Sequence, residues 1–92
     1  MDMDYAYIIK SFKRETLYIG RTTNLVRRLN EHNSGKSLST KRYAPWKYVY
    51  LEGYADELDA KNREEKLKQF GKVYSQLKRR IKRSLDLQKV RG

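Results

Sequence analysis

The stretch "YAYIIKSFKRETLYIG", residues 5–20, decides the fold, because two runs rich in aromatic and β-branched residues stand on either side of a polar segment. Such runs favour β-strands, and a short polar segment such as SFKRE is typical of a hairpin connection. We therefore predict two antiparallel strands over residues 4–10 and 16–20. The two strands carry three tyrosines, Tyr5, Tyr7 and Tyr18. These phenols can serve packing or chemistry, and the rest of the chain has to distinguish the two roles.

A helix and a third strand follow the hairpin. The helix is predicted over residues 22–33 by three residues at helical spacing, Leu25, Leu29 and His32. Thr22 or Thr23 can cap its start, and Gly35 lies just past its end. After a loop, residues 46–52 are predicted to form a strand with apolar residues on both faces. We expect such a strand to be well covered.

Two further helices complete the domain. The first is expected to run from Asp56, which can cap its start, to Phe70, with Gly71 as its stop. Its inward stripe is Ala60, Leu67 and Phe70. The second is expected from Val73 to about Arg83. The order β-β-α-β-α-α predicts an α+β fold, a small three-stranded antiparallel sheet flanked by helices.

Composition limits the protein to one small domain. It has 92 residues, of which 38% are hydrophobic. We expect the domain to span residues 1–83, with a basic C-terminal tail over 84–92 that frays beyond Leu87. The acidic start does not fit a signal peptide and no apolar run is long enough to span a membrane, so we expect a cytoplasmic protein.

The residue types also limit the metal chemistry. The absence of cysteine excludes disulfides and thiolate ligands, and a single histidine, His32, excludes the usual zinc sites. Any metal would therefore be held mainly by oxygen. Oxygen ligands favour Mg²⁺ or Mn²⁺.

Net charge points to a polyanionic partner. The chain has 22 Lys and Arg against 11 Asp and Glu, a formal charge of +11. Nucleic acid is the first choice, because phosphate neutralisation supplies most sequence-independent affinity. We expect DNA rather than RNA, although charge does not distinguish the two. A membrane surface is disfavoured, because no helix combines a basic face with a large apolar one. The residues expected to contact nucleic acid are Arg21, Lys36, Lys41, Arg42, Tyr43, Lys78, Arg79, Arg80, Lys82 and Arg83.

Two charged residues stand where a purely structural role is not the obvious one. Arg28 flanks the apolar stripe of the first helix together with His32, although such a residue commonly packs only its stem. Glu64 stands within the inward stripe of the helix that begins at Asp56. A buried unpaired carboxylate costs several kcal/mol, so Glu64 needs an arginine, a hydrogen-bond network or a metal. Taken alone, an internal salt bridge, for instance with Arg28, is the commoner outcome.

Taken together, these residues form a more specific pattern. Tyr7 is followed by Tyr18-Ile19-Gly20, by Arg28 and His32, and by a helical Glu64 after the strand PWKYVY. This pattern resembles the GIY-YIG endonuclease family, and the resemblance covers roughly residues 4–83. The YIG half is intact, whereas YAY at residues 5–7 stands in place of GIY, keeping the tyrosine and losing the glycine.

The resemblance implies hydrolysis of phosphodiester bonds at a single divalent cation, Mg²⁺ or Mn²⁺. Glu64 would be the metal ligand and Arg28 the cation that stabilises the transition state. Tyr7 and Tyr18 would lie near the attacking water, with His32 assisting through a hydrogen bond to one phenol. A tyrosine can accept a proton from water only if cations lower its pKa of about 10.

The other tyrosines are interpreted differently. Packing is the expected role of Tyr48, Tyr50, Tyr54 and Tyr74. Tyr43, which lies in a basic loop, could stack on a base or cover the sheet.

Two alternatives to a nuclease remain at this point. A non-catalytic nucleic-acid-binding module would keep the fold and the charge, but has no need of a carboxylate that repels phosphate. A structural protein of a ribonucleoprotein predicts no metal site. For the nuclease, the sequence leaves open a homodimer or a separate targeting partner.

Overall fold

The computed structural model describes residues 2–86, so the expected fraying beyond Leu87 lies outside the described residues. Its elements are β1 (Asp4–Ser11), β2 (Leu17–Thr22), α1 (Leu25–Asn33), a short 3₁₀ turn (Lys41–Tyr43), β3 (Trp46–Tyr54), α2 (Glu57–Lys68), α3 (Lys72–Arg80) and α4 (Lys82–Asp86). The three strands form one antiparallel sheet in the order β2-β1-β3. The predicted α+β fold is therefore confirmed.

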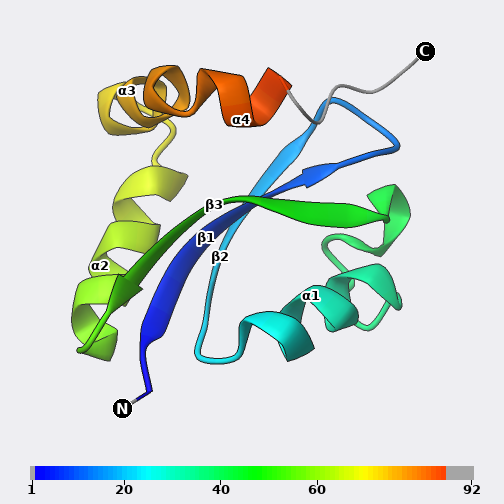
Figure 1. Ribbon diagram of the computed structural model, residues 1–92, viewed down its shortest axis with the longest axis horizontal. Helices are drawn as coiled ribbons and strands as arrows, with labels where there is room; N and C mark the ends of the chain where they lie inside the picture. Colours follow the sequence, from blue (N-terminus) through cyan, green and yellow to red (C-terminus); the bar gives the residue numbers. More distant parts are fainter. Residues whose placement is uncertain (1, 87–92) are drawn as a thin grey trace.

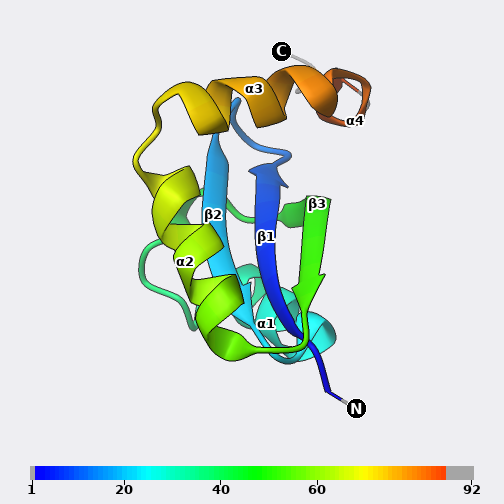
Figure 2. The ribbon, with the colours of Figure 1, turned by 90° about the vertical axis from the view of Figure 1, so that its left-hand side faces the viewer.

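Helices cover both faces of the sheet. Figure 1 shows α1 and α2 on either side of the strands, and Figure 2 shows α3 and α4 across the end of the sheet. Because side chains alternate along a strand, β1 contributes to two cores. One contains Ile8, Ile19, Leu67, Tyr74 and Leu77, and the other contains Tyr7, Ile9 and Trp46. Within the described part of the chain, no helix is long and apolar enough to cross a membrane.

The expectation that the third strand is well covered is wrong. β1 lies between the other two strands and is almost entirely buried, whereas β3 forms an edge of the sheet and is half-buried or exposed along most of its length. Val49 is an extra residue between the partners of Ile8 and Ile9, so the faces of β3 change at that point. The apolar character on both sides of β3 reflects this change of face rather than central burial.

The start of α1 also differs from the prediction. Asn24, not a threonine, caps the helix, because its Oδ1 accepts a hydrogen bond from the Arg27 N–H at 3.0 Å. Thr22 still belongs to β2, and its Oγ1 accepts from the Asn24 N–H at 3.0 Å, which orients the cap. Gly35 follows the helix with a φ of 83°, as expected for a glycine past a helix end.

The end of α2 departs from the prediction at Phe70. Ala60 and Leu67 are fully buried, as the stripe predicts, but Phe70 is 63% exposed. The helix ends at Lys68, and Phe70 takes the left-handed conformation with a φ of 54°. Gly71 does not stop α2 but precedes the first residue of α3. The chain turns before Phe70 can complete the stripe.

The predicted single helix from Val73 to Arg83 is two helices. α3 ends at Arg80, and Ile81 separates it from α4, which continues to Asp86. Lys10, buried at the end of β1, donates from Nζ to the Leu85 carbonyl at 3.0 Å. This bond attaches α4 to the sheet.

Candidate functional site

The hydroxyl of Tyr7 is the centre of a buried hydrogen-bond network between β1 and α1. It lies 2.8 Å from His32 Nε2, and Arg28 Nε donates to it at 3.3 Å. Both Tyr7 and His32 are fully buried. The hydrogen bond expected between His32 and one phenol is thus present, and its phenol is Tyr7.

The donors in this network determine the tautomer of His32. Arg28 can only donate, so the Tyr7 hydroxyl hydrogen needs an acceptor, and His32 Nε2 lies within reach. The Nδ1–H of His32 then donates to Thr40 Oγ1 at 2.6 Å. Burial, with the nearby charge of Arg28, lowers the pKa of His32 to about 4. The imidazole is therefore neutral at pH 7.

Two opposing effects act on the acidity of Tyr7. Burial raises the pKa of Tyr7 to about 12, although the hydrogen bond and charge of Arg28 act in the opposite direction. Burial lowers the pKa of Arg28, but its hydrogen bonds to Glu31 and Tyr7 outweigh this and hold it above the ordinary value. The Arg28 Nη1 to Glu31 Oε1 distance is 3.0 Å. The resting state is thus a protonated phenol against a fixed guanidinium.

Gly20 makes room for Tyr7. The two residues are partners in the β1–β2 ladder, and a Cβ at position 20 would lie 2.5 Å from Tyr7 Cζ. No side chain fits there without moving the phenol. The tyrosine of one motif and the glycine of the other are therefore a single packing unit.

The departure at the first motif is also accommodated across the sheet. Tyr5, which stands where the GIY pattern has glycine, is the partner of Gly53 on β3. A Cβ at position 53 would lie 3.1 Å from Tyr5 Cε1. A glycine on the neighbouring strand thus gives the Tyr5 ring its space.

Tyr18 lies beside the network but is more accessible than Tyr7. It is half-buried on the edge strand β2, and its ring meets the His32 ring edge to face, with centroids 5.2 Å apart. Lys68 Nζ lies 5.9 Å from the centroid of the Tyr18 ring. Of the two phenols, Tyr18 is the one that a substrate can reach from solvent.

Glu64 lies at the margin of this cluster, on α2. Lys68 Nζ is 3.0 Å from Glu64 Oε2, and Arg21 Nε is 4.0 Å from Glu64 Oε1. The suggested salt bridge between Glu64 and Arg28 is not formed, because Arg28 pairs with Glu31 on its own helix. The negative charge of Glu64 contributes to the raised pKa of Tyr7, which places the carboxylate within electrostatic range of the phenol.

The residues around Glu64 provide few metal ligands. Residues 2–86 contain no group of three His, Asp or Glu side chains that could hold a metal ion. Mg²⁺ commonly binds one or two carboxylates and keeps several waters, which substrate phosphates complete. The Glu64 side chain, which is 18% exposed, fits a site with a single protein carboxylate. It does not fit a site in which several protein side chains surround the ion.

Arg21 has a carboxylate partner on β1. Its Nη1 lies 2.8 Å from Oδ2 of Asp4, which is buried. The other oxygen, Asp4 Oδ1, is buried without a hydrogen-bond partner in the described structure. Arg21 thus lies between Asp4 and Glu64, and much of its charge is directed at carboxylates rather than at solvent.

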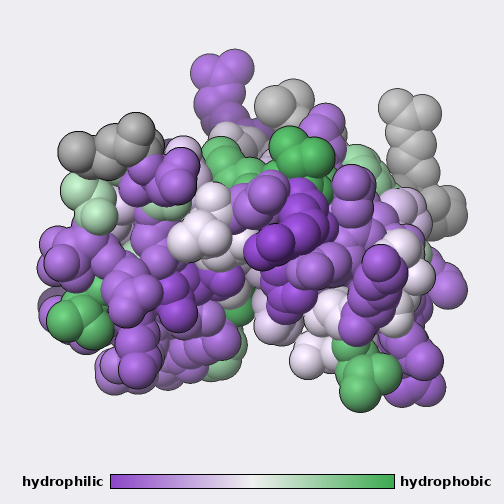
Figure 3. All heavy atoms as spheres, turned by 90° about the horizontal axis from the view of Figure 1, so that it is seen from below, coloured by the Kyte–Doolittle hydropathy of each residue, from purple (hydrophilic) through white to green (hydrophobic). Residues whose placement is uncertain are grey.

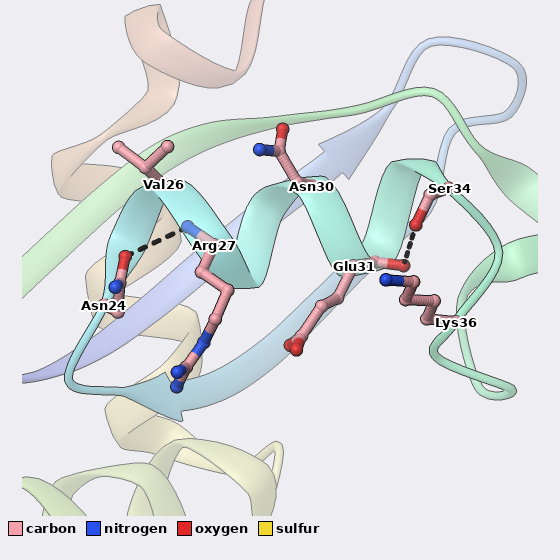
Figure 4. A pocket seen from close by; sticks show the side chains of 7 residues that line it. All are labelled: Asn24, Val26, Arg27, Asn30, Glu31, Ser34 and Lys36. Atoms are coloured by element: carbon pink, nitrogen blue, oxygen red, sulfur yellow. Dashed lines mark hydrogen bonds between the residues drawn. The ribbon is translucent and has the colours of Figure 1, made fainter.

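The other basic residues predicted to contact nucleic acid lie in two separate places. The first is the segment after α1, with Lys36, Lys41 and Arg42 exposed. Lys36 lies at a hollow on the outer face of α1, near Arg27 and Glu31 (Figure 4). This hollow is lined by the cap residue Asn24, by side chains of α1 and by residues after the helix, and does not include Tyr7 or Tyr18.

Tyr43 follows Arg42 and is half-buried against the Tyr7, Ile9 and Trp46 core. Its hydroxyl accepts from Arg14 Nη1 at 3.2 Å, and Arg14 Cζ lies 5.2 Å from its ring centroid. This packing favours the role of covering the sheet.

The second basic group lies on α3 and α4 and comprises Lys78, Arg79, Arg80, Lys82 and Arg83. These helices cross the end of the sheet opposite α1 (Figure 2). Figure 3 shows a mainly hydrophilic surface from below, with a notch between its two halves and small, separate hydrophobic patches. Because α3 and α4 lie at the end of the sheet away from α1, the predicted basic residues do not form one patch.

Three site residues were not predicted from the sequence. Glu31 pairs with Arg28 three residues before it on α1, a spacing at which helical side chains meet. Thr40 is fully buried, binds His32 through Oγ1, and accepts at its carbonyl from Trp46 Nε1 at 2.8 Å. Nothing in the loop sequence distinguishes it from its neighbours. Lys68 could have been found, because it stands four residues after Glu64 on the same helix face.

The fold is that of a small α+β domain, and comparison with known proteins gives the family. The sequence-family model of the GIY-YIG catalytic domain matches residues 3–78 of the chain. The chain belongs to the GIY-YIG family.

The relatives carry names that give no activity. A UPF0213 protein of Clostridium perfringens, CPE1444, is 41% identical over 63 residues, 67% of each chain. A UPF0213 protein of Staphylococcus haemolyticus, SH2523, is 38% identical over 73 residues, 78% of this chain and 88% of its own. One of Haloquadratum walsbyi, HQ_3675A, is 34% identical over 70 residues, 75% of this chain and 78% of its own. No solved structure matches the chain significantly.

Proposed function

We propose that this protein is a metal-dependent endonuclease that hydrolyses phosphodiester bonds in nucleic acid, DNA rather than RNA. The observation that carries the proposal is the fixed guanidinium of Arg28, held between the Tyr7 hydroxyl and Glu31 beside an accessible phenol, Tyr18. The family match and the net charge of +11 support the same reading.

Arg28 would stabilise the charge that develops on the phosphate oxygens. Its Nε is used by Tyr7 and its Nη1 by Glu31, which fixes the plane of the guanidinium and leaves further N–H groups for a ligand. A cation that is already oriented does not have to reorganise as charge develops. Tyr7 and Glu31 therefore act as positioning residues for Arg28.

Tyr18 would orient or deprotonate the attacking water. Its half-buried position leaves the phenol open to solvent, whereas Tyr7 is fully buried and engaged with His32 and Arg28. Neutral His32 accepts the Tyr7 hydrogen bond and keeps the phenol oxygen directed at Arg28. This division of roles gives Tyr18 the proton transfer and Tyr7 the positioning.

Glu64 would hold the divalent cation, Mg²⁺ or Mn²⁺. When bound, such an ion stabilises negative charge on phosphate oxygens. Lys68 and Arg21 neutralise the carboxylate in the structure described here, so the ion has to compete with the Lys68 amine at 3.0 Å.

A second function has one observation in its favour. Glu64 with Lys68 and Arg21 is arranged as an internal ion-pair group, which a non-catalytic nucleic-acid-binding module could also contain. Such a module would bind without cleaving. Charge alone does not separate these two functions.

A cleavage assay separates them. The protein is incubated with labelled single-stranded, duplex and branched DNA and RNA, in Mg²⁺, in Mn²⁺ and in EDTA. We expect metal-dependent internal cleavage of a DNA substrate, and its loss in the matched variant Arg28→Lys, which keeps the charge and loses the fork geometry. Binding of every substrate without cleavage of any would support the binding module instead.

A further inference from the structure

Phe70 combines two features that a structural role does not explain. Its φ of 54° lies in the left-handed region, where a residue with a Cβ is strained and glycine is the usual choice. Its ring is nevertheless 63% exposed. A glycine at this position would satisfy the turn better, so the aromatic ring serves something other than the turn.

The ring of Phe70 lines a groove that reaches the candidate site. The groove has a volume of about 300 Å³, and its walls are Leu17, Tyr18, Ile19, Lys68 and Phe70. Phe70 meets Tyr74 edge to face, with centroids 5.2 Å apart, so Tyr74 supports the ring from one side. Tyr18 thus belongs both to the groove and to the cluster around His32.

We propose that this groove binds an unpaired nucleobase of the substrate, stacked on Phe70, next to the phosphate that Arg28 and Tyr18 act on. The proposal rests on the proposed function for the position of that phosphate.

The chemistry of the groove favours a base over other occupants. The groove is lined by two aromatic and two aliphatic residues, and a base has a flat π surface of the kind that stacks on aromatic rings. Lys68 also lines the groove. Its ammonium group is paired with Glu64 but has further N–H groups that can donate to a phosphate oxygen of the attached chain. A paired base is already stacked in its duplex and would not be available to Phe70.

Phe70 can be tested without disturbing the fold. Phe70→Gly removes the ring and suits the left-handed backbone, and Phe70→Asn, a second variant, also tolerates that conformation. We expect both to unfold at or above the melting temperature of the wild type. Phe70→Trp keeps a stacking surface, and Leu58→Ala removes an exposed apolar side chain near the start of α2 as a matched control.

The measurement is binding in EDTA to two single strands of equal length, one with ordinary bases and one in which every base is absent. Stacking on one aromatic side chain should be visible as a change of about 5- to 100-fold in Kd. We expect Phe70→Gly and Phe70→Asn to weaken binding of the ordinary strand by that factor and to leave the abasic strand and a duplex unchanged. Phe70→Trp and Leu58→Ala should bind both strands like the wild type.

Two outcomes overturn the proposal. An equal loss on ordinary and abasic strands would mean that Phe70 acts through the fold or the phosphate path, and no loss on either would mean that no base lies there. Sedimentation is measured in parallel. A wild-type dimer that Phe70→Gly converts to monomer, with unchanged binding of bases, would assign the groove to a second copy of this chain.

Failure of this proposal is distinguishable from failure of the nuclease. Base-dependent loss in Phe70→Gly without any cleavage by the wild type would keep the stacking site and remove the catalytic function. Metal-dependent cleavage without that loss would keep the nuclease and remove the stacking site.

Discussion

The two faces of the sheet carry different types of side chain. The aliphatic face, toward α2 and α3, has a core of Ile8, Ile19, Leu67 and Leu77. Its polar network lies at the margin of this core, where Tyr50 and Arg63 donate to Glu52. The tyrosine face, toward α1, is formed by Tyr7, Tyr18, His32 and Thr40, which are joined by hydrogen bonds and ring contacts. Both faces draw on neighbouring residues of the same two strands.

The two faces contribute different properties. The aliphatic face contributes stability, and the tyrosine face contributes a fixed arrangement of polar groups. Apolar side chains pack without directional bonds, so the aliphatic face stabilises the fold through burial and close packing. Buried phenol and imidazole groups gain little net stability and cost much if a partner is lost. The tyrosine face is therefore the place where the protein maintains a fixed geometry, which is what a catalytic site needs.

The largest effect is expected from Glu64→Ala. We expect metal-dependent cleavage to fall by more than about 10³-fold, because the proposed metal ligand is removed, while folding and nucleic-acid binding remain. Initial rates at saturating substrate and circular dichroism check this. An unfolded Glu64→Ala would instead assign Glu64 to the ion-pair group, and full activity would remove it from the site.

The two phenols give the next prediction. Tyr18→Phe deletes one accessible hydroxyl, and we expect the chemical step to slow by about 10²- to 10⁴-fold with little change in melting temperature. Tyr7→Phe leaves His32 and Arg28 short of a partner, so it should also lose roughly 1 to 3 kcal/mol of stability. Single-turnover rates and thermal unfolding of both variants test the division of roles. Wild-type rates from both would exclude a phenol mechanism.

Leu67→Ala tests the aliphatic face. Leu67 is fully buried, so truncation should cost about 2 to 5 kcal/mol of unfolding free energy. The rate per folded molecule should stay near that of the wild type. Denaturant unfolding measures the loss of unfolding free energy. Cleavage rates, corrected by active-site titration for the amount of active protein, measure the rate per folded molecule. Leu58→Ala is the control, because the Leu58 side chain is 61% exposed. It should change the free energy of unfolding by less than about 0.5 kcal/mol. A large rate loss in folded Leu67→Ala would contradict the separation of the two faces.

The smallest effect is a pH dependence of stability from the tyrosine face. The pKa of His32 is lowered to about 4 by burial, against 6.5 when exposed, so the unfolded chain binds a proton that the folded chain does not. Stability is then full above pH 6.5 and is lost as the pH falls toward 4, by roughly 2 kcal/mol between pH 7 and pH 5. Urea unfolding across this range measures it. His32→Gln should flatten the dependence, and an unchanged slope would assign it to other groups.

Much of the fold could be predicted because its signals are local. The hairpin, the first helix and the sheet class follow from residue types and from spacing within one element. The central position of β1 could not be read in this way, because the apolar residues of β3 resemble those of a central strand until its extra residue, Val49, is seen. The left-handed Phe70 was missed because Gly71, one residue later, offered the more usual stop.

The site could be predicted only as a set of residues. Tyr7, Tyr18, Arg28, His32 and Glu64 were identified by their order along the chain, and their roles remain predictions. The partner of His32 could not be predicted, because its pairing with Thr40 depends on how the loop after α1 folds back. Arg28 and Glu31 lie three residues apart on α1, so helical spacing alone allows their pairing. A threonine among several polar loop residues has no distinguishing sequence signal.

The contact between Gly20 and Tyr7 has a consequence for strand pairing. A slip of β2 by two residues would keep every side chain on its own face, so alternation alone does not forbid it. Such a slip would place Tyr18 or Thr22 opposite Tyr7, where a Cβ meets the phenol ring. The glycine therefore allows one alignment of the hairpin and makes its nearest face-preserving competitors sterically unfavourable, so the β1–β2 pair itself specifies its register.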